Sequence, residues 1–143
     1  MTVAMPAGAL APALTNPSTV EVAVAARKVF VFGSNLAGRH GKGAALAARR
    51  EHGAIYGQGE GPQGFAYAIP TKDAQLTTLS LETIASHVEA FKRYAAAHPH
   101  MTFRVTPIGC GLAGYRPSQI APMFHDAPGN CELPPEFISI LSA

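Results

Sequence analysis

The chain has 143 residues and a mass of 14.9 kDa, which suits one domain and is too small for two. Apolar residues make up 48% of it and charged residues only 14%, whereas a disordered chain has few apolar residues and a large net charge. The formal net charge of +2 does not indicate a strong nucleic-acid surface, which needs clustered Lys and Arg. We therefore expect a folded domain over residues 27–143.

The first 26 residues are rich in Ala, Pro and Val and differ in composition from the rest. The first basic residue is Arg27, so the charged start of a signal peptide is missing. Pro6, Pro12 and Pro17 interrupt the apolar runs, and no stretch approaches the ~20 apolar residues of a membrane span. We expect a cytoplasmic protein without a membrane partner, in which residues 1–26 form a flexible extension.

The first predicted element is a strand over residues 28–32, because KVFVF is a short β-branched and aromatic run typical of a strand buried on both faces. A glycine loop over residues 33–43 leads into an alanine-rich helix at 44–50, with Gly53 as its stop. The loop matches neither the Walker A nor the dinucleotide-binding pattern. Two interpretations of the loop are therefore equally favoured: a phosphate-binding loop at a helix N-terminus, and a structural turn.

The middle of the chain predicts an irregular segment followed by a strand. Residues 57–64 (GQGEGPQG) are too polar and glycine-rich for a regular element. Residues 65–70 (FAYAIP) then predict a strand that delivers Thr71, Lys72 and Asp73 at its end. For an arbitrary lysine, the usual interpretation of such a position is a surface charge.

The second half predicts a helix, a strand and a second glycine loop. Apolar residues at helical spacing follow Ser80, which is placed as the N-cap. A β-rich run over residues 102–108 leads into the glycine loop 109–115, after which Pro117 can open a short helix. The tail over residues 131–141 is expected to add an edge strand.

Strands that alternate with helices predict a three-layer α/β fold. In such sheets ligands bind outside the carboxyl ends of the strands. The three chemically distinctive segments, residues 33–43, 70–73 and 109–115, all fall at such ends. This convergence predicts a binding site there.

The cysteines and histidines do not indicate a metal. Cys110 and Cys131 have neither metal-ligand nor redox-motif spacing, and a reduced pair is expected. Three ligands at a useful spacing are missing among the histidines, so we expect no metal site and no cofactor. Cys110 lies between two glycines, but no histidine adjoins it in sequence, and a packed thiol is the more common role.

Three blocks of sequence together resemble the macrodomain family: FGSNLAGRHGKGAA at residues 32–45, IPTK at 69–72 and PIGCGLAGY at 107–115. They occur in the family's order within residues 28–125. The chain is most similar to the branch of terminal ADP-ribose glycohydrolases and bacterial antitoxins that remove ADP-ribose from DNA. The resemblance implies a three-layer α/β/α macrodomain-like fold with a mixed central sheet.

The resemblance also implies that the first and third blocks bind an ADP-ribose-type nucleotide, free or attached to a macromolecule. The second glycine loop and the start of the first helix would hold the diphosphate and the distal ribose, which Asn35 would face. The implied ligand-binding residues are Gly33, Ser34, Asn35, Gly41, Lys42, Gly43, Ala44, Gly109, Cys110, Gly111, Leu112, Ala113, Gly114 and Tyr115.

Lys72 matches the lysine that this branch uses as a nucleophile on the anomeric carbon of the distal ribose. The amine must lose its proton before it can attack, and Arg39 or Lys42 could favour that as cationic neighbours. Eukaryotic glycohydrolases of the family have a catalytic aspartate where this chain has Ala113, and Asp73 is the candidate replacement. The alternative is a non-catalytic module that binds or sequesters ADP-ribose.

Overall fold

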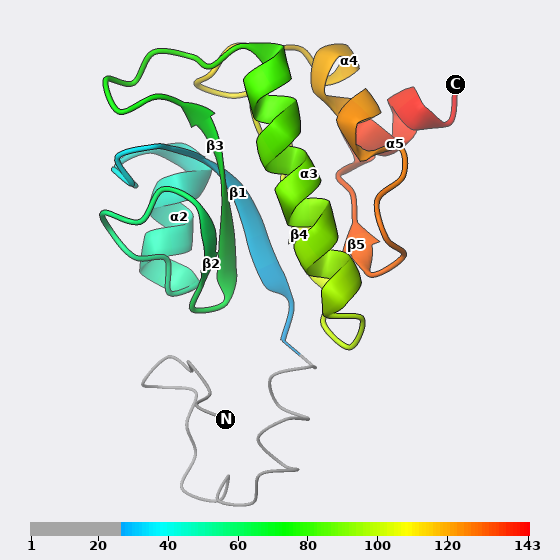
Figure 1. Ribbon diagram of the computed structural model, residues 1–143, viewed down its shortest axis with the longest axis horizontal. Coiled ribbons are helices and arrows are strands. Elements are labelled where there is room, and N and C mark those ends of the chain that lie inside the picture. The colour runs from blue at the N-terminus through cyan, green and yellow to red at the C-terminus, as the bar shows by residue number, and fades with distance from the viewer. Residues whose placement is uncertain (1–26) are drawn as a thin grey trace, which may run out of the picture.

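The computed structural model describes residues 27–143, and the expected extension over residues 1–26 lies outside the described part. The chain runs through five strands and five helical segments there (Figure 1). In order these are β1 (Val29–Asn35), α2 (Gly43–Glu51), β2 (Gly61–Gln63), β3 (Ala66–Lys72), α3 (Leu81–Ala97), β4 (Phe103–Val105), α4 (Pro117–Ile120), the 3₁₀ helix η2 (Ala121–Phe124), β5 (Cys131–Glu132) and α5 (Pro135–Leu141).

The strands form one mixed sheet in the order β2-β3-β1-β4-β5. The central strand β1 pairs in parallel with β3 on one side and with β4 on the other. β5 extends the sheet in parallel beyond β4, and β2 runs antiparallel to β3. The predicted α/β class with a mixed sheet is confirmed. Parallel pairing places the carboxyl ends of β1, β3 and β4 at the same edge.

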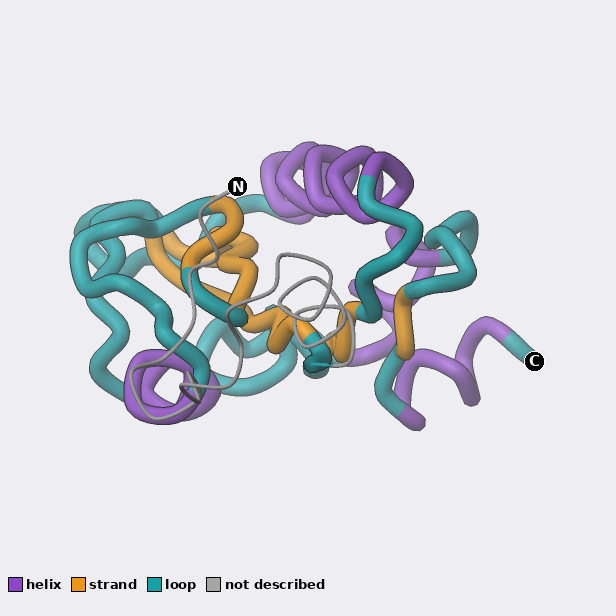
Figure 2. The backbone as a smooth tube through the Cα atoms, turned by 90° about the horizontal axis from the view of Figure 1, so that it is seen from below, coloured by secondary structure: helices purple, strands orange, loops and turns teal. Residues whose placement is uncertain are grey.

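Alternate residues of the central strand face two separate clusters of buried side chains. Val29 and Val31 join the cluster under α3, whereas Phe32 joins the cluster under α2. A strand with both faces buried requires such an apolar run. Figure 2 shows α2 and α3 on opposite sides of the sheet.

The cluster under α2 is built largely from alanine. Ala45 and Ala48 of the helix meet Ala66 and Ala68 of β3, and small side chains let a helix approach a sheet closely. The approach places the start of α2 beside the ends of the central strands.

The long helix α3 begins as its sequence predicts. The Ser80 hydroxyl accepts a hydrogen bond from the Thr83 N–H at 3.2 Å, so Ser80 is the N-cap. Ile84, Val88 and Phe91 bury the apolar stripe of the helix against the sheet. No helix within residues 27–143 is long and apolar enough to cross a membrane.

Two strands are longer at their carboxyl ends than expected. β1 continues through Asn35, so residues 33–35 belong to the strand and not to the glycine loop. β3 likewise continues to Lys72. The two strands pair up to these residues, with a register shift after Ser34. Pairing between neighbouring strands overrides the local preference of glycine and serine for a turn.

The prediction of no regular element over residues 57–64 was wrong, because β2 forms there. The Gln63 side chain stabilises it by accepting a hydrogen bond from the Ile55 N–H at 2.7 Å and donating one to the Gln58 carbonyl at 3.1 Å. The pairing of β2 with β3 completes the sheet at this edge.

The end of the chain also differs from expectation. β4 covers only three residues of the expected run, and β5 is a two-residue edge strand. The helix α5 follows where a continued strand was expected. Pro135 is its first residue, a position at which the missing N–H and fixed φ of proline favour a helix.

Candidate functional site

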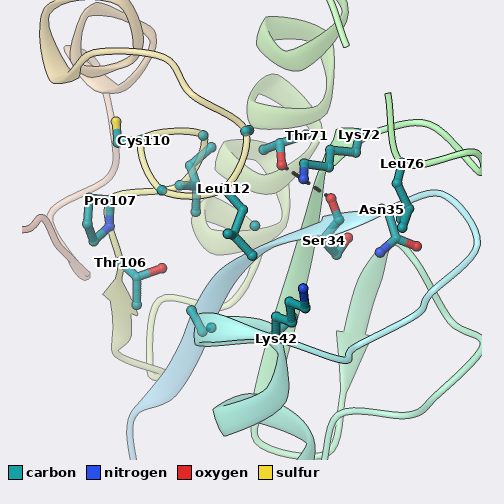
Figure 3. Close-up of a pocket in the computed structure, with 18 of the residues that line it drawn as sticks. Ser34, Asn35, Lys42, Thr71, Lys72, Leu76, Thr106, Pro107, Cys110 and Leu112 are labelled. Atoms are coloured by element: carbon teal, nitrogen blue, oxygen red, sulfur yellow. Dashed lines mark hydrogen bonds between the residues drawn. The ribbon is translucent and has the colours of Figure 1, made fainter. Parts of the chain in front are cut away.

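A cavity of about 800 Å³ lies at the carboxyl ends of β1, β3 and β4 (Figure 3). Its size falls in the range of small-molecule sites, roughly 300–1,000 Å³. The residues that line it are Gly33, Ser34, Asn35, Arg39, Gly41, Lys42, Gly43, Ala44, Ala45, Thr71, Lys72, Leu76, Thr106, Pro107, Ile108, Gly109, Cys110, Gly111, Leu112, Ala113, Pro117 and Glu136. The three segments singled out in the sequence therefore meet in one cavity.

The wall at the ends of β1 and β3 is fixed by buried hydrogen bonds. The Ser34 hydroxyl donates to the Gly59 carbonyl, and the Thr71 hydroxyl donates to the Ser34 carbonyl at 3.2 Å. The Leu36 N–H donates to the Lys72 carbonyl at 3.0 Å. These bonds hold the backbone from which the Lys72 side chain extends.

The carboxamide of Asn35 holds the loop that follows β1. Its Nδ2 donates to the Arg39 carbonyl and its Oδ1 accepts from the Arg39 N–H, both at 2.9 Å. Asn35 is only 7% exposed. Asn35 is one of the residues that line the cavity, and the hydrogen bonds of its side chain position the loop that carries Arg39 and Lys42.

The helix α2 presents its N-terminus to the cavity. Its first intrahelical hydrogen bond runs from the Leu46 N–H to the Lys42 carbonyl at 3.2 Å, which leaves the N–H groups of residues 43–45 without a partner inside the helix. No side chain of the described residues caps this end. Free N–H groups and the helix dipole favour an anion at such an end.

The glycine loop after β4 forms the facing wall. Gly109 has φ +75°, and a side chain there would lie 3.1 Å from Ile120 Cδ1, so this position requires glycine. At Gly111 an added Cβ would meet nothing within 4 Å. Leu112 is 66% exposed, and its Cδ1 would lie 3.8 Å from a Cβ added at Gly43. It therefore reaches across to the start of α2.

The charged side chains of the lining are unevenly distributed. Arg39, Lys42 and Lys72 are cationic, and Glu136 is the one carboxylate among the described lining residues. Within residues 27–143 none of these four forms a salt bridge. Figure 3 shows the ends of the Lys42 and Lys72 side chains directed into the same space. The cavity is therefore suited to an anionic ligand.

Cys110 lies at the other end of the cavity from Lys72 (Figure 3). Burial raises the pKa of its thiol, and the nearby Glu136 carboxylate raises it further. Both effects keep the thiol protonated at neutral pH, so Cys110 is poorly suited to act as a nucleophile.

Three residues expected at the site do not line the cavity. The Asp73 carboxylate accepts hydrogen bonds from the Gln75 and Thr77 N–H groups, both at 2.9 Å, and so holds the turn after β3. The Tyr115 hydroxyl donates to the Leu79 carbonyl at 2.7 Å, and Gly114 precedes it outside the lining.

Other lining residues were missed by the sequence reasoning. Leu76 has φ +66°, which is unusual for a residue other than glycine and marks a constrained turn. Thr106 and Pro117 complete the wall, and Glu136 comes from a helix that was not expected. No local pattern points to Glu136, because only the packing of α5 brings it to the cavity.

Comparison with protein-family models, curated proteins and solved structures finds no match to this chain. Within residues 27–143 no three His, Cys, Asp or Glu side chains lie close enough to hold a metal ion.

Proposed function

We propose that the cavity binds an ADP-ribose-type nucleotide, and that the protein hydrolyses an ADP-ribosyl linkage with Lys72 as nucleophile. The observation that carries the proposal is that all three macrodomain-like blocks line one cavity of about 800 Å³. A macrodomain-like fold is part of the same proposal. The mixed sheet with helices on both faces is compatible with it.

The diphosphate would lie between the start of α2 and the glycine loop after β4. The free N–H groups of residues 43–45 can donate to its oxygens, and the lack of side chains at Gly109 and Gly111 lets the loop backbone approach them. Lys42 adds a positive charge at the same end of the helix. A diphosphate carries the negative charge that this lining requires.

The distal ribose would then lie beside Lys72. The neutral Nζ attacks the anomeric carbon, and the bond from that carbon to the leaving group breaks as the C–N bond forms. The proton released from Nζ passes to the leaving group. Water then cleaves the C–N bond, which yields free ADP-ribose and restores the amine.

A second candidate function is non-catalytic binding of ADP-ribose. It is favoured by the position of Asp73, whose carboxylate is held by the turn after β3 and lies outside the lining. Ala113 lines the cavity where the resembling glycohydrolases have an aspartate. In this alternative, Lys72 makes only an electrostatic contact with the ligand and takes no part in bond cleavage.

Substitution of Lys72 separates the two candidates. If Lys72 is the nucleophile, Lys72→Ala and Lys72→Arg both lose turnover, because a guanidinium stays protonated and cannot attack. ADP-ribose affinity then changes little in either variant. If Lys72 is an electrostatic contact, Lys72→Arg retains binding and Lys72→Ala weakens it by about 1.5–3 kcal/mol.

The measurement is release of ADP-ribose from ADP-ribosylated protein and from ADP-ribosylated DNA, with affinities from calorimetry. Lys28→Ala is the matched control, because Lys28 pairs with Glu132 on the surface and is not part of the lining. Turnover by Lys72→Ala would exclude the nucleophilic role. A wild-type protein that binds ADP-ribose but releases none from either substrate would support the second candidate. Failure of the wild type to bind ADP-ribose at millimolar concentration would refute both.

A further inference from the structure

The cavity has two chemically different ends. At one end the side chains of Lys42 and Lys72 extend into the same space (Figure 3), and Arg39 and Lys42 supply positive charge to the lining. Toward the other end lies Cys110 (Figure 3), and Glu136 lines the cavity from α5, which packs against α4, the helix that follows the loop of Cys110. The strand order agrees with this, since Lys72 ends β3 whereas Glu136 follows β5 at the far edge of the sheet.

The span between these ends suits an extended ligand. Three strand spacings separate β3 from β5, a distance of roughly 14 Å. The lining also includes apolar Pro107 and Ile108, which precede Cys110 in the chain, and Pro117 at the start of α4. Apolar surface with one acceptor suits the nucleoside part of a nucleotide, which offers a flat base and N–H and O–H donors.

We infer that Glu136 determines ligand specificity by accepting a hydrogen bond from the nucleoside and by repelling any anionic group at that end. The inference rests on the proposed binding of an ADP-ribose-type nucleotide and extends it. The cations attract the diphosphate and Glu136 rejects phosphate, so the ligand binds in one orientation, with its distal ribose at Lys72. A nucleotide phosphorylated on its nucleoside ribose is excluded, because the added phosphate would face the Glu136 carboxylate.

The test uses two ligands, ADP-ribose and its 2′-phosphorylated form, with the full-length wild type and Glu136→Gln. The substitution preserves shape and removes the charge. ADP-ribose should bind Glu136→Gln about 5-fold more weakly, because a charge-assisted hydrogen bond is replaced by a neutral one. The phosphorylated ligand should bind the same variant at least about 5-fold more tightly, because the repulsion is gone. Glu82→Gln makes the same charge change on α3, outside the lining, and should alter neither affinity.

The opposite direction of the two changes is decisive. If both ligands gain affinity in Glu136→Gln, the carboxylate acts as a diffuse charge and the inference is overturned, as it is if neither affinity changes. A wild type that binds ADP-ribose but does not discriminate against the phosphorylated form also overturns the inference and leaves the proposed function intact. A wild type that binds neither ligand overturns the proposed function itself.

A third ligand identifies the donor that Glu136 accepts. Replacement of adenine by hypoxanthine removes the exocyclic amine and leaves the ribose hydroxyls in place. If the base supplies the donor, the hypoxanthine ligand binds the wild type more weakly than ADP-ribose and loses nothing further in Glu136→Gln. If a ribose hydroxyl supplies it, both ligands lose affinity equally in the variant. Either result supports the inference.

Discussion

Replacement of Asn35 by alanine should weaken both the fold and the ligand site. The side chain is buried and makes two hydrogen bonds of 2.9 Å to the backbone of Arg39. Each such bond contributes about 0.5–1.5 kcal/mol net, so the substitution should lower the free energy of unfolding by about 1–3 kcal/mol. For a domain of this size that corresponds to a fall in Tm of roughly 4–12 °C. ADP-ribose affinity should fall as well, because the loop that carries Arg39 and Lys42 loses its support.

Calorimetry on the full chain measures both effects, and Asn130→Ala is the matched control. The Asn130 carboxamide also donates to backbone carbonyls, those of Ala95, His98 and Met101, each at 3.0 Å. It lies outside the lining, so its loss should lower Tm without lowering affinity. Asn35→Asp should resemble Asn35→Ala, because a carboxylate would face the Arg39 carbonyl. Equal losses of Tm in Asn35→Ala and Asn130→Ala, with full ADP-ribose affinity in both, would refute a role of this loop in binding. Lost affinity with an unchanged Tm in Asn35→Ala would show that Asn35 acts by direct contact with the ligand alone.

Two further predictions concern the glycine loop and the acid stability of the fold. Gly111→Val should abolish ADP-ribose binding, because the added side chain would occupy the space of the ligand, and should change Tm little, because a Cβ at this position meets no protein atom within 4 Å. Gly109→Val should instead lower Tm, because of the φ of +75° and the contact with Ile120. Unchanged calorimetric affinity in Gly111→Val would show that the loop is not part of the binding site. The hydrogen bond from Lys92, 2.5 Å long, lowers the pKa of Asp126 below its ordinary 3.8, so the pair stabilises the fold above pH 3.8 and this stabilisation is lost as the pH falls through the lower folded-state pKa. Lys92→Met should therefore show a smaller fall in Tm than the wild type on acidification below about pH 4, whereas Lys28→Met, which breaks an exposed pair with Glu132, should fall as the wild type does.

The central elements were predictable because local and tertiary preferences agree there. The apolar run that forms β1 is buried on both faces, and the stripe after Ser80 is buried on one, so sequence periodicity and packing give the same answer. The same holds for the meeting of the three distinctive segments, because parallel pairing of β1, β3 and β4 brings the ends of distant segments to one edge. Lys72 and the glycine loop after β4 could therefore be assigned to one cavity from their places after strands.

The rest depends on contacts that local sequence does not encode. β2 forms in a stretch rich in glycine because Gln63 and the edge of β3 supply its hydrogen bonds. Asp73 adjoins Lys72 in sequence, yet it lies just beyond the end of β3, and its carboxylate folds back on its own turn. Glu136 is 64 residues from Lys72 and reaches the cavity only because α5 packs against α4 and η2.

The turn after β3 connects the two sides of the cavity and holds them in position relative to each other. Asp73 holds this turn, and Thr78 at its end donates a hydrogen bond of 3.0 Å to the Ala113 carbonyl in the facing loop. Leu76, with its left-handed backbone, lies between them and lines the cavity. Since Lys72 immediately precedes the turn, the distance between the lysine and the glycine loop is set by this connection. Asp73, the candidate replacement for the catalytic aspartate, thus has a structural role in the position of the lysine. The proposed hydrolysis requires no carboxylate from Asp73, because the proton released from Nζ can itself pass to the leaving group.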